Sequence, residues 1–83
     1  MKSEEKRVAN ISIVVKDKNS TPVVNEILSK HGDVIHGRLG IPYSERGVSI
    51  IIILVDADNS SIGAISGSLG NVPGVTIRST MLI

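Results

Sequence analysis

The stretch Val48–Val55 constrains the fold of this chain more than any other part of it. It reads Val-Ser-Ile-Ile-Ile-Ile-Leu-Val and ends in the longest uninterrupted apolar run, Ile50–Val55. Because polar and apolar residues do not alternate here, a strand at this position is apolar on both faces and needs cover on both sides. The stretch therefore predicts a strand in the middle of a sheet. The six-residue run is far shorter than the roughly 20 residues of a membrane helix, so we expect a soluble protein.

Three further segments show the alternation that is typical of strands: Val8–Val15, Asp33–Pro42 and Val75–Ile83. In the middle one, the alternation predicts two faces, with Ile35, Leu39 and Ile41 on one and Val34, His36 and Arg38 on the other. Together with the apolar stretch, these segments predict a sheet of four strands.

Two segments between the predicted strands have helical spacing. Thr21 is predicted to cap a helix that has Pro22 at its first position, where a missing N–H costs nothing, and Gly32 follows its end. Asp58 is predicted to cap a second helix that ends at Gly70. The second helix carries apolar residues at spacings of three and four, namely Ile62, Ile65 and Leu69.

The order strand, helix, strand, strand, helix, strand predicts an α+β fold of the ferredoxin-like βαββαβ type. Right-handed crossovers place both helices on one side of a four-stranded antiparallel sheet, with the first and third strands central. With 83 residues, 41% hydrophobic and 20% charged, the chain has the composition of one globular domain. We predict this domain over residues 8–83, preceded by a flexible leader over residues 1–7.

The side of the predicted sheet that faces away from the helices is here called the open face. On it we place Asn10, Ser12, Val14, His36, Arg38, Thr76, Arg78 and Thr80, together with either Ile50, Ile52 and Leu54 or Ile51, Ile53 and Val55. Each large aliphatic side chain gains about 1.5–3 kcal/mol when it is fully buried, so three of them left in water forgo a large share of a small domain's stability.

The open face therefore predicts self-association into a dimer or tetramer, through this face or through a sheet edge. We expect Arg38 and Arg78 at the polar rim of the interface. The full set of expected interface residues is Ser12, Val14, His36, Arg38 and Arg78. In the alternative, a monomer covers the apolar strip with the stems of lysine and arginine side chains.

Charge and cysteine content exclude several classes of function. Nine basic and eight acidic residues give a net charge of +1, too little for direct nucleic-acid binding through phosphate contacts. The chain has no cysteine, which excludes disulfides, thiolate metal sites and a cysteine nucleophile. The charged N-terminus lacks the pattern of a signal peptide, so we expect a cytoplasmic protein.

Catalysis and metal binding have little support in the sequence. No Ser/His/Asp arrangement, carboxylate pair or metal triad is evident, so we predict neither an enzyme nor a cofactor. The only histidines are His31, expected at a helix end, and His36, expected in a strand, so they do not converge within one subunit. On the open face His36 could still meet a symmetry mate, which leaves metal sensing as an alternative.

The loop before the first predicted helix is a candidate binding site. Hydroxyl and backbone N–H groups at a helix start can bind a carboxylate or another small anion. The candidate ligand-binding residues are Asn19, Ser20 and Thr21. The simpler alternative is a polar turn with a helix cap.

Several quoted stretches resemble a known family, namely Arg38-Leu39-Gly40-Ile41-Pro42-Tyr43, Gly47-Val48-Ser49-Ile50-Ile51, the block from Asp58 to Gly70, and Pro73-Gly74-Val75. The chain resembles the iron-only hydrogenase system regulators, an ACT-like family related in fold to the C-terminal domain of the nickel-responsive repressor. The resemblance implies a stand-alone regulatory domain linked to iron-only hydrogenase metabolism, with a small-molecule effector bound at a subunit interface. The alternatives are a structural interaction subunit for a hydrogenase or maturation protein, or a metal sensor.

Overall fold

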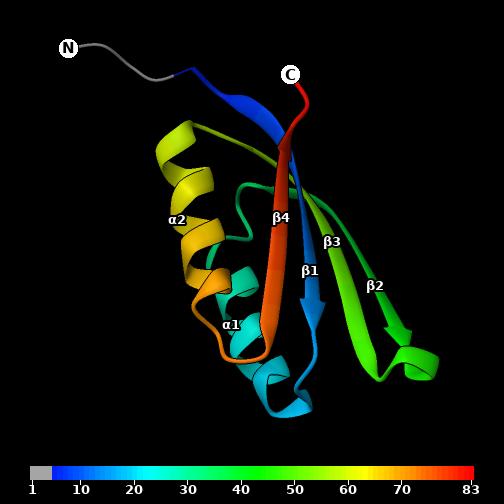
Figure 1. Cartoon of the computed structure of the whole chain (residues 1–83). Helices are drawn as coiled ribbons and strands as arrows, with labels where there is room; N and C mark the ends of the chain where they lie inside the picture. The colour runs from blue at the N-terminus through cyan, green and yellow to red at the C-terminus, as the bar shows by residue number, and fades with distance from the viewer. Residues whose placement is uncertain (1–4) are drawn as a thin grey trace.

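Strands β1 (Arg7–Val15) and β3 (Val48–Ala57) form the centre of the fold. In the computed structural model, which describes residues 5–83, β1 pairs antiparallel with β3 on one side and with β4 (Val75–Met81) on the other. Strand β2 (Ile35–Tyr43) pairs antiparallel with the free side of β3, which gives the order β2-β3-β1-β4 shown in Figure 1. The prediction of a four-stranded antiparallel sheet with the first and third strands central is confirmed.

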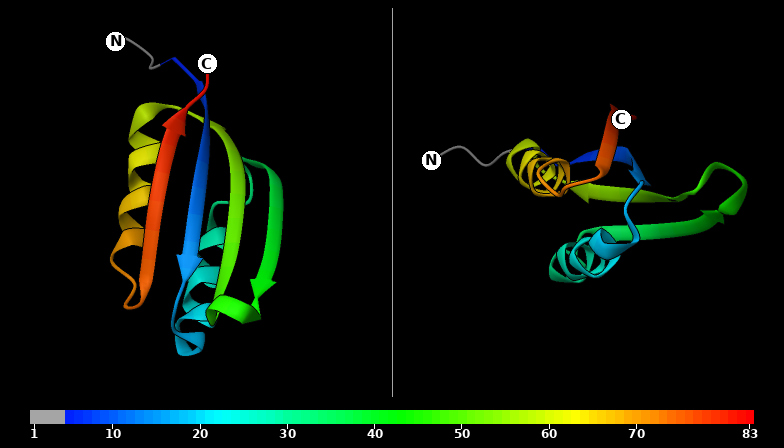
Figure 2. Two further views of the ribbon diagram at one scale, coloured as in Figure 1. Left: turned by 45° about the vertical axis from the view of Figure 1, so that its right-hand side comes forward. Right: turned by 60° about the horizontal axis from the view of Figure 1, so that its bottom comes forward.

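Helices α1 (Thr21–Lys30) and α2 (Asn59–Gly70) lie on the same face of the sheet (Figure 2). Within residues 5–83, the opposite face carries no helix. Two short 3-10 helices, η1 (Lys18–Ser20) and η2 (Ser44–Arg46), connect β1 to α1 and β2 to β3. This arrangement is the predicted ferredoxin-like βαββαβ fold. Between residues 5 and 83, no helix is long and apolar enough to cross a membrane.

The hydrophobic core fills the space between the sheet and the two helices. Strands β1 and β3 each send every second side chain into it. Its buried members are Ala9, Ile11, Ile13, Val15, Val24, Leu28, Ile51, Ile53, Val55, Ala57, Ile62, Ile65, Leu69 and Val72. Because Ile51, Ile53 and Val55 face the helices, the alternative set Ile50, Ile52 and Leu54 lies on the open face.

The start of β1 lies next to the predicted domain boundary in the sequence. Arg7 is the first residue of β1, so the strand begins one residue before the predicted Val8. The predicted leader falls largely on residues 1–4, which lie outside the described part of the chain.

The cap of α1 differs from the prediction, and the cap of α2 agrees with it. Ser20, not Thr21, stands at the N-cap of α1, because a 3-10 turn held by Asp17 comes first and Thr21 is already helical. The Asp17 carboxylate accepts a hydrogen bond from the Asn19 backbone N–H at 2.9 Å. At α2, the Asp58 carboxylate accepts from the Ser61 backbone N–H at 2.8 Å, as an N-cap does.

A β-bulge interrupts β2 near its start. Ile35 lies opposite Val55, but Gly37 already lies opposite Leu54, so His36 is an extra residue without a partner position on β3. Since side chains alternate along a strand, one extra residue moves all the following side chains to the other face. The predicted alternation through Asp33–Pro42 is therefore wrong beyond His36.

The bulge reverses the predicted faces for the rest of β2. Arg38 lies opposite the buried Ile53 on the helix side, where its guanidinium donates to the Asn25 side-chain oxygen at 2.7 Å. Its predicted place on the open face is wrong. Leu39 and Ile41 occupy the open face instead.

Gly74 and Gly63 differ in backbone conformation and in the space around them, so an alanine at each position should change stability in opposite directions. A Cβ on Gly74 would lie 2.8 Å from the Asp17 Cβ, and its φ of 75° disfavours any other residue. We expect Gly74→Ala to lower the free energy of unfolding by about 1–3 kcal/mol. Gly63 lies inside α2 with open space around it, so Gly63→Ala should raise stability by about 0.5–1 kcal/mol. Chemical denaturation measures both, and equal effects would contradict this account.

The cap at Asp58 makes stability depend on pH. Hydrogen bonds from the Ser61 backbone N–H and hydroxyl hold the pKa of the Asp58 carboxyl below its ordinary value of 3.8. A lowered folded pKa stabilises the protein above the unfolded pKa, and this stabilisation is lost as the pH falls through the folded value. We expect Asp58→Asn, which keeps a capping oxygen, to flatten the loss of stability below about pH 4. Denaturation curves at several pH values test this, and Asp58→Ala should be destabilised at every pH.

Candidate functional site

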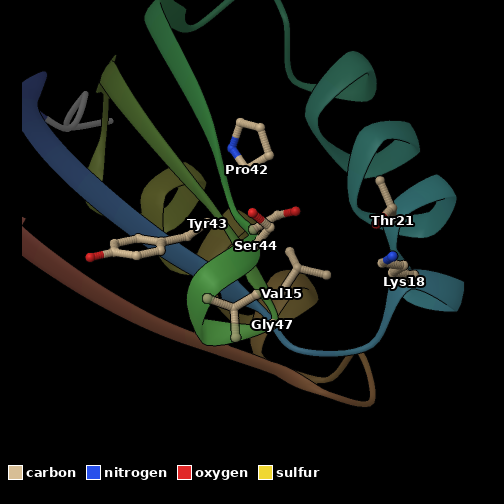
Figure 3. A pocket seen from close by; sticks show the side chains of 9 residues that line it. Val15, Lys18, Thr21, Pro42, Tyr43, Ser44 and Gly47 are labelled. Carbon is tan, nitrogen blue, oxygen red and sulfur yellow. The ribbon is translucent and has the colours of Figure 1, made fainter.

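The hairpin between β2 and β3 approaches the start of α1. The hairpin turns through η2 and closes at Gly47, whose φ of 67° is left-handed and whose amide donates to the Ser44 carbonyl at 3.0 Å. A hollow of about 210 Å³, here called the helix-side hollow, lies between this turn and α1 (Figure 3). Its lining residues are Val15, Lys18, Thr21, Pro42, Tyr43, Ser44, Gly47, Val48 and Ser49.

The helix-side hollow combines an apolar floor with polar walls. In Figure 3, Lys18 and Thr21 stand on the α1 side, Pro42 and Ser44 stand on the hairpin side, and Val15 lies between them. One ammonium group and several hydroxyl groups around an apolar floor suit a small ligand with a carboxylate. The Tyr43 ring extends away from Lys18 and Thr21.

The hollow contains one of the three predicted ligand-binding residues, Thr21. Ser20 is buried, and its hydroxyl donates to the Pro73 carbonyl, so this side chain ties η1 to the turn before β4. Asn19 is exposed and does not line the hollow. Sequence reasoning missed the hairpin residues Ser44 and Ser49, because only the folding of the sheet brings them near α1, and no local pattern marks them.

The open face has an apolar half and a polar half. Three rows cross it from β2 to β4, and each row becomes more polar in that direction. The rows are Ile41–Ile50–Val14–Thr76, Leu39–Ile52–Ser12–Arg78 and Gly37–Leu54–Asn10–Thr80. The apolar strip, defined as Val14, Leu39, Ile41, Ile50, Ile52 and Leu54, therefore lies mainly over β2 and β3.

Several side chains of the apolar strip are open to solvent. The exposed fractions are 54% for Leu39, 43% for Ile41 and 38% for Leu54. Of the expected interface residues, Ser12, Val14 and Arg78 lie on the open face, whereas His36 stands in the bulge. Leu39 and Ile41 were not expected on the open face, because nothing in the local sequence marks the bulge that brings them there.

The two histidines stand on different elements of the fold. His31 is the C-cap of α1 and His36 is the bulge residue of β2. Over residues 5–83, no group of three or more His, Cys, Asp or Glu side chains is placed to hold a metal ion.

The sheet order and the two helices on one face define a ferredoxin-like α+β domain. The chain belongs to the TM1266-like family, described as "Iron-only hydrogenase system regulator, putative", whose model matches residues 7–79. This confirms the resemblance noted from the sequence. The description of the family is that of a regulator.

Comparison with solved structures agrees with the family. TM1266 from Thermotoga maritima is 36% identical, with a TM-score of 0.91 over 95% of this chain and 100% of that chain. The C-terminal domain of MgtC from Mycobacterium tuberculosis is 11% identical, with a TM-score of 0.72 over 99% of this chain and 94% of that chain, and shares the fold alone. No curated protein matches the chain.

Proposed function

We propose that this protein is a regulatory domain of an iron-only hydrogenase system that works as a homo-oligomer assembled through its open face. The observation that carries the proposal is the apolar strip, half-exposed on a sheet face without helices. A second part of the proposal is that a small carboxylate effector binds in the helix-side hollow.

The free energy of burial favours assembly. Complete burial of one large aliphatic side chain contributes about 1.5–3 kcal/mol, and the strip holds six aliphatic residues that are only partly buried. Covering them adds several kcal/mol, which is comparable to the stability of a small domain. A second copy offers a matching surface, since an isologous interface joins the same patch of both subunits.

The three rows contain few long polar side chains that could cover the strip in a monomer. Among the residues of the three rows, only Arg78 has a long charged stem. It lies on β4, with β1 between it and the apolar strands β3 and β2. Arg78 is therefore placed for the polar rim of an interface and not for shielding the strip.

The effector part of the proposal rests on the chemistry of the helix-side hollow. Lys18 lies just before α1, and Thr21 is the first residue of this helix. On the hairpin side, the hollow is lined by Ser44 and Ser49. Ammonium and hydroxyl groups donate the hydrogen bonds that a carboxylate accepts. Because the hollow joins the hairpin to α1, a bound ligand would hold together two elements that are separate in sequence.

Assembly is tested with paired substitutions to glutamate. We expect the wild type to be a dimer or tetramer at micromolar concentration. We expect Leu39→Glu/Leu54→Glu to be monomeric, because assembly of this variant would bury two negative charges. Val23 is 46% exposed on α1, away from the open face, so Val23→Glu serves as the matched control and should remain assembled. Size-exclusion chromatography with light scattering gives the masses. A monomeric wild type contradicts the proposal.

Effector binding is tested by a thermal-shift screen of amino acids and small carboxylates. A ligand at about 100 times its Kd adds about 2.7 kcal/mol, which raises the Tm of a domain of this size by roughly 10–20 °C. We expect Lys18→Gln and Thr21→Val to reduce this shift, because both side chains line the hollow. Lys30→Gln, in the last turn of α1, is the control and should keep the full shift. The effector proposal is abandoned if no compound in the screen stabilises the wild type.

A further inference from the structure

A second hollow lies on the other side of the sheet, at the end of the apolar strip. It has a volume of about 330 Å³ and is here called the open-face hollow. Val14 and Ile50 are direct partners across β1 and β3 on the open face, so the hollow faces away from the helices. Its lining residues are Val14, Lys16, Tyr43, Arg46, Val48 and Ile50.

We propose that the open-face hollow binds a small organic anion with an apolar body, of the class of arylalkyl or branched-alkyl carboxylates. This hollow lies on the opposite face of the sheet from the helix-side hollow, although both are lined by Tyr43 and Val48. The proposal requires neither the effector site nor self-association.

The apolar part of such a ligand fits the floor and wall of the hollow. Val14, Val48 and Ile50 are each partly buried and form an aliphatic surface at the end of the strip. Tyr43 lies directly opposite Val48 in the β2–β3 ladder and is 41% exposed, so its ring is available to a ligand. A pocket of this volume lies at the small end of the range for ligand sites, which limits the ligand to a small molecule.

The anionic part is indicated by two cations from different parts of the chain. Lys16 follows β1, and its backbone is fixed by a hydrogen bond of 2.7 Å from its N–H to the Gly74 carbonyl. Arg46 ends η2, the turn that the Gly47 amide closes onto Ser44.

No acidic side chain lines this hollow in the part of the chain that the structure describes. A carboxylate bound in the hollow is attracted to both cations. The combination of an apolar floor and two cations selects against neutral ligands and against small anions that have no apolar body.

The test compares three probes by NMR titration of the labelled protein. Phenylacetate carries both features, phenylacetamide is its neutral analogue, and acetate lacks the apolar body. We expect phenylacetate to shift the amide resonances of Val14, Lys16, Arg46 and Ile50, which line this hollow and not the helix-side hollow. It should bind about tenfold more tightly than either of the others. The titration is also run on Leu39→Glu/Leu54→Glu, so that a second copy on the open face cannot hide the hollow.

Charge removal identifies the site. We expect Lys16→Gln/Arg46→Gln to weaken phenylacetate about tenfold and to leave phenylacetamide unchanged, since only the carboxylate uses the two cations. Lys30→Gln removes a cation from the last turn of α1, outside both hollows, so it is the matched control and should bind as the wild type does. Equal binding of acid and amide overturns the proposal. Shifts centred on Thr21 and Ser44 also overturn it. So does the absence of phenylacetate binding by both the wild type and Leu39→Glu/Leu54→Glu.

Discussion

The pairing of β1 with β3 is the interaction on which the rest of the structure depends. Each strand sends one set of side chains into the core under the helices, and β3 carries a second aliphatic set on the open face. Strands β1 and β3 stand at the centre of the sheet, and β2 and β4 stand at its edges. The surplus set, Ile50, Ile52 and Leu54, is the part of β3 that one copy of the fold leaves partly exposed.

The bulge at His36 adds further aliphatic side chains to the open face beside those of β3. Without the extra residue, Arg38 would lie on the open face and Leu39 would lie on the helix side. With it, Leu39 and Ile41 extend the aliphatic surface of β3 to the edge of the sheet, and Arg38 is held by Asn25 of α1. A single insertion in the register of one edge strand thus separates the open face into an apolar half and a polar half.

Both hollows lie at the end of the β2–β3 hairpin. The two hollows lie on opposite faces of this end and share Tyr43 and Val48. After β1, Lys16 lines the open-face hollow, and Lys18, two residues further on, lines the helix-side hollow. The segment after β1 therefore places one lysine beside an apolar surface on each side of the sheet.

Local sequence patterns predict the element order, the central place of β3 and the cap at Asp58, because alternation, unbroken apolar runs and capping residues act over a few neighbouring positions. They left the choice between the two aliphatic sets of β3 open and placed Arg38 on the wrong face. They also identified only Thr21 among the residues of the helix-side hollow. These features were decided by tertiary structure, because the register across a bulge and the approach of a hairpin to a distant helix depend on contacts between segments far apart in the chain.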